Sequence, residues 1–285
     1  MLTTETRRTR GRRPPFRLVV GGIIVLVVAL SAVFAPWIAG SDPLKQNTRN
    51  RLHPPALLGG GGPHLLGTDA LGRDTLSRIL YGGRVSLALG GAAVAVAGSL
   101  GVLLGLVAGY YGRGVDELLT RLADVQLAFP VILLAVAIVA VLGTSLPTLI
   151  AALSLSGWVV YARTVRGEVL SLREREFVVA ARAHGARDGR ILFRHILPNT
   201  LPPVLVIATV QLATMIVLES ALSFFGLGTP PPTPTWGGML AEGRDYLSNA
   251  WWVATFPGLA ISLTVLGVNL LGETLRDLVD PGLRE

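Results

Sequence analysis

The sequence predicts an all-α polytopic membrane protein with six transmembrane helices. Its 285 residues are 51% hydrophobic and 15% charged, whereas an average soluble domain is about 25% charged. Five stretches without a charged side chain cover about half of the chain: 18–41, 85–112, 125–162, 195–218 and 246–272. Uncharged apolar runs of about 18 residues or more are typical of membrane spans, because a soluble helix needs a polar face. The pattern excludes an ordinary soluble enzyme, a disordered chain and a nucleic-acid-binding domain.

The first span is predicted over residues 18–39, directly after a strongly basic segment. Six arginines precede it: Arg7, Arg8, Arg10, Arg12, Arg13 and Arg17. A cleaved signal peptide has an apolar core of about 7–15 residues, and this apolar core is longer. We therefore expect an uncleaved signal-anchor helix.

The second span, 85–110, carries a small residue at every fourth position. The five small residues are Ala93, Ala97, Gly101, Gly105 and Gly109. They share one helix face, which permits close helix contact in lipid. We expect this face to pack inside the chain's own bundle rather than against a second copy. The amphipathic residues 74–84 before this span are expected to lie at the outer membrane surface.

Residues 125–162 predict a helical hairpin. A single helix of that length would measure about 57 Å, nearly twice the roughly 30 Å apolar core of a bilayer. The turn-forming residues 143–147 divide the run into spans at 126–142 and 146–162.

The last two spans are predicted at 201–222, starting near Pro202 and Pro203, and at 251–272. Between them the run 224–241 is apolar too, but four prolines exclude a helix there. These prolines are Pro230, Pro231, Pro232 and Pro234.

The basic residues predict the orientation of the chain. Most of the 25 Lys and Arg residues fall on the inner side when both termini are cytoplasmic, as the positive-inside rule requires. The net charge of +7 therefore reflects membrane orientation rather than a nucleic-acid partner.

The chain offers little chemistry of its own. It has no cysteine, and its single lysine, Lys45, precedes Gln46, so it lacks the Gly-Lys-Ser/Thr of a phosphate-binding loop. No catalytic residue or cofactor is expected in this chain. No metal site is expected either, because the four histidines have no metal-binding spacing. Glu219 is the one acid inside a span. It is either a functional residue or, as we favour, a structural carboxylate near the outer end of its helix.

The loop 163–200 is the most informative segment. It contains eight arginines and four acids, yet residues 177–181 are small or apolar and predict a helix. Gly185 predicts a turn, and a second short helix follows with Ile191, Leu192 and Ile196 on its apolar side, closed by Pro198. This helix-turn-helix is expected to be a docking surface for another protein. The alternative is an amphipathic loop on the membrane surface.

Residues 179–198 resemble the EAA loop of ATP-binding-cassette (ABC) importer permeases. Ala180, Ala181, Gly185, Leu197 and Pro198 match the pattern Glu-Ala-Ala, three residues, Gly, nine residues, Ile-x-Leu-Pro. The chain departs from it at two positions, with valine at 179 in place of Glu and histidine at 195 in place of Ile.

Further segments resemble the C-type permease of dipeptide, oligopeptide and nickel importers. They are LGTDALGRDTLSRILYGGRVSL (66–87), GYYGRGVDELLTRLADVQLAFP (109–130), YARTVRGEVLSLREREFVVAARAHGA (161–186) and LSFFGLGTPPPTPTWGGMLAEGR (222–244). The resemblance covers most of residues 12–285. It implies the MetI-like core of type I importers in a bacterial or archaeal cytoplasmic (inner) membrane. It divides the chain into an N-terminal part, 1–65, and a permease domain, 66–285.

The resemblance also implies partners and site residues. The partners are a homologous B-type permease, two ABC ATPase subunits or domains that bind ATP and Mg²⁺, and an extracellular or periplasmic solute-binding protein. The residues implied to dock the ATPase are Val179, Ala180, Ala181, Arg182, Gly185, Ala186, Leu197 and Pro198. Glu219 and Trp236 are candidates for the translocation path or for contact with the binding protein.

The leading interpretation is a non-enzymatic permease subunit of an importer of di- or oligopeptides. Three alternatives stay open. The same machine could import nickel, glutathione or another small solute. The chain could be a membrane scaffold or receptor without transport, or a secondary carrier, although the absence of acids near the middle of any span argues against the carrier.

Overall fold

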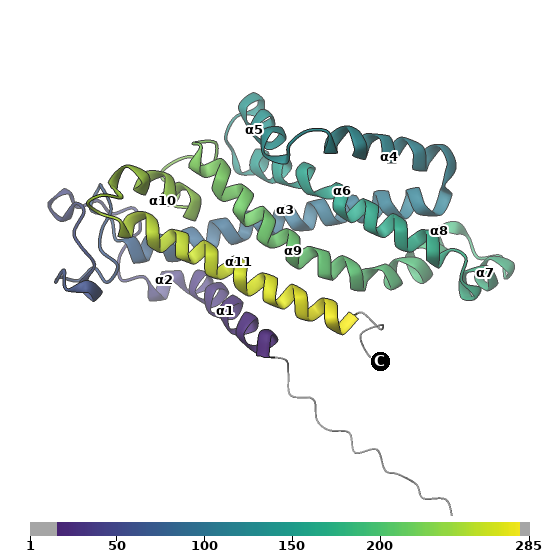
Figure 1. Ribbon diagram of the computed structural model, residues 1–285, viewed down its shortest axis with the longest axis horizontal. Helices are drawn as coiled ribbons and strands as arrows, with labels where there is room; N and C mark the ends of the chain where they lie inside the picture. The colour runs from purple at the N-terminus through teal and green to yellow at the C-terminus, as the bar shows by residue number, and fades with distance from the viewer. Residues whose placement is uncertain (1–15, 280–285) are drawn as a thin grey trace, which may run out of the picture.

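The computed structural model describes residues 16–279 of the chain, and their regular secondary structure is helical (Figure 1). Five of the arginines expected before the first span, Arg7, Arg8, Arg10, Arg12 and Arg13, lie outside the described residues. The helices in chain order are α1 (Phe16–Val33), α2 (Ala35–Ile38), α3 (Thr75–Tyr111), α4 (Arg113–Leu127), α5 (Val131–Leu142), α6 (Leu146–Leu172), α7 (Glu176–Ala183), α8 (Asp188–Arg190), α9 (Leu197–Phe224), α10 (Trp236–Gly243) and α11 (Trp252–Val279). Short 3-10 turns are η1 (Thr48–Asn50), η2 (Ala56–Leu58) and η4 (Arg244–Tyr246), and η3 (Ile191–Ile196) is a π-helical segment.

The number of spans agrees with the prediction. Within the described residues five helices are long and apolar enough to cross a bilayer, namely α1, α3, α6, the continuous helix from α8 to α9, and α11. The bent pair α4–α5 makes a sixth. The six-helix all-α fold class is therefore confirmed, although several helix boundaries differ from those predicted.

The third span is not the single helix predicted over 126–142. Helix α4 ends at Leu127, α5 begins at Val131, and the two are bent by 88°. Pro130 precedes α5 and has no N–H to continue the α4 hydrogen-bond ladder. Helix α5 alone, with 12 residues, would measure about 18 Å, too short to cross the bilayer core. The second half of the hairpin, α6, begins at Leu146 as predicted.

Helix α3 begins ten residues before the predicted span. Asp74 caps it, its carboxylate accepting a hydrogen bond from the Ser77 N–H at 2.8 Å. Residues 75–84 are therefore the first turns of the 37-residue helix α3, not a separate helix on the membrane surface. The polar side of these turns is also buried, because Arg78 is only 2% exposed.

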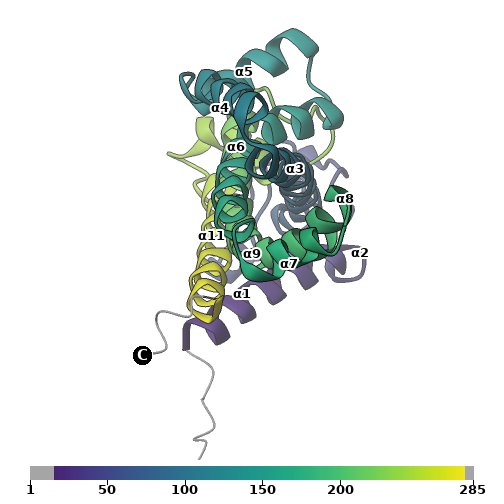
Figure 2. The same ribbon diagram turned by 90° about the vertical axis from the view of Figure 1, so that its right-hand side faces the viewer.

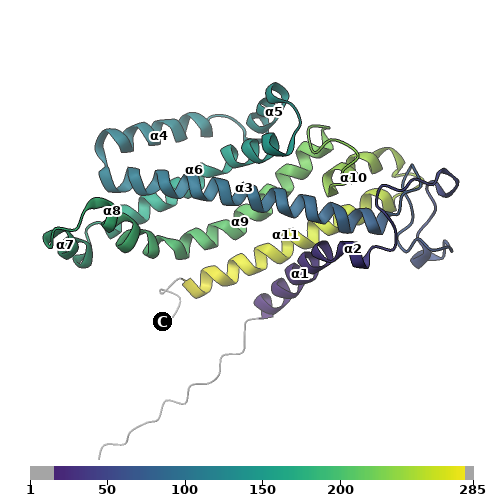
Figure 3. The ribbon, with the colours of Figure 1, turned by 180° about the vertical axis from the view of Figure 1, so that it is seen from behind.

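The small-residue face of α3 packs inside the chain's own bundle, as predicted, and its partner there is α6. All five of its small residues are buried. A Cβ atom on Gly105 would lie 2.6 Å from the Ala162 carbonyl oxygen, and one on Gly101 would lie 2.4 Å from the Trp158 carbonyl oxygen. Glycine is thus required for this helix contact, which runs along the length of the molecule (Figure 3).

Helices α3, α6, α9 and α11 form the central bundle (Figure 2). Helix α1 lies along α11 at one edge, where a Cβ atom on Gly21 would approach the Gly267 carbonyl oxygen to 2.9 Å. The α4–α5 pair lies at the opposite edge (Figure 2). Helix α7 and helix α10 lie at opposite ends of the long axis (Figure 1).

The proline-rich segment after α9 does contain a helix at its end. Residues 225–235 form no α-helix, but α10 begins at Trp236, inside the range from which a helix was excluded. The last proline is Pro234, so the residues after it again carry N–H groups. The Thr235 side chain caps α10 by accepting a hydrogen bond from the Gly238 N–H at 3.0 Å.

Candidate functional site

Helix α7 confirms the helix predicted around residues 177–181. Its apolar side is fixed by Val178, which is fully buried in a cluster with Val169 of α6 and Ile191 of η3. Glu176 lies in the first turn and Arg182 in the last, which matches the polarity of the helix dipole. The helix therefore presents one face to the bundle and leaves the other exposed.

Gly185 ends α7 in a Schellman motif, in agreement with the predicted turn. The Gly185 N–H bonds to the Arg182 carbonyl and the Ala186 N–H bonds to the Ala181 carbonyl, each at 3.0 Å. Gly185 has φ +77°, a left-handed conformation that costs other residues about 1–2 kcal/mol. Ala181 and Ala186 are both half-buried against the cluster around Val178. The turn direction after α7 is thus set by this one glycine.

The second predicted helix continues directly into the next span. Ile191, Leu192 and Ile196 are buried as predicted, but Pro198 does not end the helix, and Pro202 and Pro203 lie inside α9 rather than at its start. Prolines remove N–H donors from the helix ladder. Two polar side chains bond other carbonyls of the same turns: Asn199 Nδ2 donates to His195 O at 2.6 Å and Thr200 Oγ1 to Leu197 O at 2.9 Å.

Polar contacts join α7 and α8 to the end of α3, which is itself bonded to the end of α6. The Tyr110 hydroxyl at the end of α3 donates to Asp188 Oδ1 at 2.7 Å. The Arg182 guanidinium carbon lies 5.8 Å from the centre of the Tyr110 ring, a cation–π distance. Arg173, which follows α6, donates to the Gly109 carbonyl at 3.0 Å. These contacts tie α7 and α8 to the end of α3, and the end of α3 to the residue that follows α6.

The predicted docking residues divide into an exposed and a half-buried set. The exposed residues are Val179, Ala180, Arg182, Gly185 and Pro198, and the half-buried ones are Ala181, Ala186 and Leu197. Two aromatic residues beside them were not included among the candidates: Phe177 is 43% exposed and Phe193 is 56% exposed. Phe193 falls outside the apolar stripe formed by Ile191, Leu192 and Ile196, so the apolar pattern of its helix does not identify it.

Glu219 and Trp236 both lie in the interior at the opposite end of the bundle. The Glu219 carboxylate is fully buried and accepts hydrogen bonds from Ser223 Oγ at 2.7 Å and Ser86 Oγ at 3.3 Å. Trp236 is 2% exposed and its Nε1 donates to the Ile79 carbonyl at 2.9 Å. The carboxylate is thus hydrogen-bonded by hydroxyl groups inside the protein. Both residues link α3, α9 and α10, and their proposed contact with substrate or with a binding protein remains a prediction.

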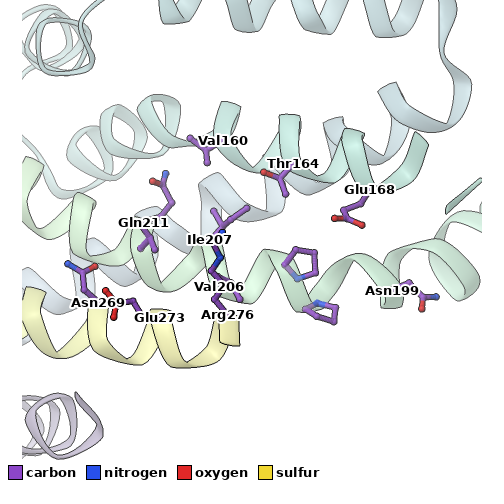
Figure 4. A pocket seen from close by; sticks show the side chains of 14 residues that line it. Val160, Thr164, Glu168, Asn199, Val206, Ile207, Gln211, Asn269, Glu273 and Arg276 are labelled. Carbon is purple, nitrogen blue, oxygen red and sulfur yellow. The ribbon is translucent and has the colours of Figure 1, made fainter. Parts of the chain in front are cut away.

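A cavity of about 940 Å³ lies between α6, α9 and α11 (Figure 4). Its polar lining comes from all three helices: Thr164, Glu168, Asn199, Gln211, Asn269, Glu273 and Arg276. None of these residues was among the candidates from the sequence. Gln211 and Asn269 are amides inside uncharged stretches, and such polar residues in an apolar span could have indicated the cavity. No group of three or more His, Asp or Glu side chains in the described part of the chain could hold a metal ion.

The sequence matches two family models. Residues 101–285 match the binding-protein-dependent transport system inner membrane component, and residues 18–55 match the N-terminal transmembrane domain of oligopeptide transport permease C. The first match covers more than half of the chain. The chain belongs to this family of binding-protein-dependent permeases. It is accordingly a multi-span inner-membrane component of an ABC importer, a transport system that works with an ATPase and a binding protein.

Several curated permeases are similar over most of their length. The dipeptide transport system permease protein DppC of Alkalihalophilus pseudofirmus is 47% identical, over 93% of this chain and 86% of the relative. The di/tripeptide permease DppC of Pseudomonas aeruginosa is 45% identical, over 93% and 88%. The glutathione permease GsiD of Pectobacterium atrosepticum is 42% identical, over 93% and 87%.

A solved structure has the same fold as this permease. A chain of the inward-facing MetNI methionine ABC transporter superposes with a TM-score of 0.55 at 20% identity, covering 71% of this chain and 96% of that chain. The predicted MetI-like core is thereby confirmed as a fold.

Proposed function

We propose that this permease forms half of the pathway of an ATP-driven importer of di- and oligopeptides. The observation that carries the proposal is helix α7, an exposed helix that one apolar cluster fixes to α3, α6 and α9. The substrate class is supported by the relatives named for dipeptides and tripeptides. The positive-inside rule favours cytoplasmic termini, and with that orientation α7 faces the ATPases.

The partner proteins supply ATP binding, the other half of the pathway and delivery of the peptide. Two ABC ATPase subunits or domains bind ATP and Mg²⁺ and hold the exposed residues of α7, while a homologous B-type permease completes the pathway. ATP binding brings the two ATPases together and displaces α7. The Schellman turn and the Tyr110 contacts carry this displacement into the bundle, where the cavity changes its accessible side. An extracellular or periplasmic binding protein delivers the peptide at the end where α10 lies.

The test is reconstitution of the whole complex in proteoliposomes, with uptake and ATP hydrolysis measured together. Ala180→Glu places a charge on the exposed face of α7 and is expected to raise the ATP consumed per peptide while membrane insertion is unchanged. Ser171→Glu, which adds the same charge at an exposed position of α6, is the matched control. Normal coupled transport in the Ala180 variant would show that α7 is not the docking element.

Glutathione is a second candidate substrate, because a glutathione permease is 42% identical to this chain. Uptake of labelled dipeptide and of labelled glutathione through the same complex separates the two. A scaffold without transport would not co-purify with an ATPase pair, so purification from membranes tests that alternative.

A further inference from the structure

The cavity between α6, α9 and α11 has the length of a short peptide. It extends along α9 from Asn199 to Gln211, a helical rise of about 18 Å. An extended peptide advances about 3.4 Å per residue, so roughly five residues span that length. Figure 4 shows Thr164 and Glu168 projecting from α6 towards α9, with Asn269 and Glu273 on α11.

The cavity contains one acid and one base that have no ion-pair partner among the described residues. These are Glu168 on α6 and Arg276 on α11. Glu273, the other charged residue of the lining, is paired: its Oε2 lies 3.2 Å from Arg17 Nη1. Glu168 is half-buried and Arg276 is exposed, so both side chains are free to meet a ligand that carries a charge of each sign.

We propose that Glu168 binds the terminal ammonium group and Arg276 the terminal carboxylate of a peptide in this cavity. This inference rests on the proposed function and adds to it the way in which the substrate is recognised. A zwitterion that leaves water loses hydration at both ends, and fixed countercharges offset part of that cost. Arginine suits the carboxylate end because its guanidinium donates two parallel hydrogen bonds.

The remaining lining explains how peptides of different sequence are accepted. Val206, Ile207 and Val210 on α9 are apolar and select no particular side chain. The amides of Gln211 and Asn269 can donate to peptide carbonyls and accept from peptide N–H groups. Recognition is therefore confined to the backbone and its charged ends, which every unblocked peptide shares.

The experiment is saturation-transfer NMR on the detergent-solubilised complex without the binding protein, so that the permease cavity alone selects. The probes are pentaalanine with free termini, its N-acetylated form and its C-amidated form. The intact complex is expected to bind the free peptide about three- to fivefold more tightly than either blocked form, as one partly solvated ion pair provides. Glu168→Gln should abolish the preference over the N-acetylated form only, and Arg276→Gln the preference over the amidated form only.

Glu117→Gln and Arg121→Gln are matched controls, because this exposed pair lies on α4, away from the cavity. They should keep both preferences. Equal binding of all three probes by the intact complex would overturn the proposal, and so would a uniform loss of all binding in the Glu168 variant. ATP-driven dipeptide uptake by the same preparation is measured in parallel. Its absence would contradict the proposed function, whereas uptake without the terminal preferences would contradict only this site.

Discussion

Arg78 at the start of α3 lies against Asp69 of the preceding loop, with 2.5 Å between Arg78 Nη1 and Asp69 Oδ2. The same guanidinium donates to both carboxylate oxygens of Glu242 on α10, at 2.6 and 3.0 Å. Asp69 also accepts from Arg73 Nε at 2.6 Å. Four charged side chains thus fix the long loop, α3 and α10 to one another at the end of the bundle opposite α7.

We expect Arg78→Met to destabilise the protein. Removing one member of a buried charge cluster leaves the others incompletely paired, which costs about 3 kcal/mol or more. Arg84→Met is the matched control, since Arg84 lies on the same helix but is exposed. Thermal unfolding in detergent, followed by tryptophan fluorescence, should show a lower melting temperature for the first variant only. Equal melting temperatures of the two variants would mean that the charge cluster does not stabilise the folded protein.

The contact between α3 and α6 predicts that Gly105→Leu prevents correct packing. A side chain at this position would meet the Ala162 carbonyl oxygen and Val165, and relief requires the two helices to separate. Overpacking of a core costs about 1–3 kcal/mol or more. Gly91→Leu, on the same helix with no atom within 4 Å of the added Cβ, should be tolerated. Size-exclusion chromatography of the purified complexes would distinguish them, and a normal profile for both would contradict this packing.

The charge-free stretches predict how many spans there are but not where each helix ends. A helix can project beyond the membrane, as α3 does from Thr75 to residue 84, and charges on its first turns can be buried against a neighbour, as Arg78 is. A helix break inside a span cannot be detected from the charge pattern either, because residues 126–142 are uncharged on both sides of the bend at Pro130.

The structure of residues 176–198 could be predicted from the local sequence, whereas the cavity could not. Gly185 determines its turn through its own backbone, and Val178, Ile191 and Ile196 form an apolar pattern within one segment. The cavity depends on how α6, α9 and α11 are rotated about their axes. Glu168 and Arg276, 108 positions apart in the numbering, line one cavity only after the three helices have packed.

We expect Gly185→Ala to uncouple transport from ATP hydrolysis. Alanine at φ +77° costs about 1–2 kcal/mol, enough to disfavour the Schellman turn and to alter the direction in which the chain leaves α7. Gly189→Ala is the control, because Gly189 has no left-handed φ and open space around it. In proteoliposomes the Gly185 variant should take up several-fold less peptide per ATP hydrolysed. An unchanged ratio would mean that the turn is not needed for transmission.

The hydroxyl of Tyr110 provides the most specific test of how α7 acts on the bundle. Tyr110→Phe keeps the ring beneath Arg182 and removes the hydroxyl, with its hydrogen bond to Asp188 and its interaction with Arg182. A hydrogen bond to a charged group contributes about 1.5–3 kcal/mol. We expect folding and ATPase binding to be retained, and the uptake per ATP hydrolysed to fall. Tyr111→Phe is the control, because the adjacent tyrosine is 51% exposed and its hydroxyl has no hydrogen-bond partner among the described residues. Equal effects of the two substitutions on coupling would show that α3 and α8 are joined by apolar packing alone.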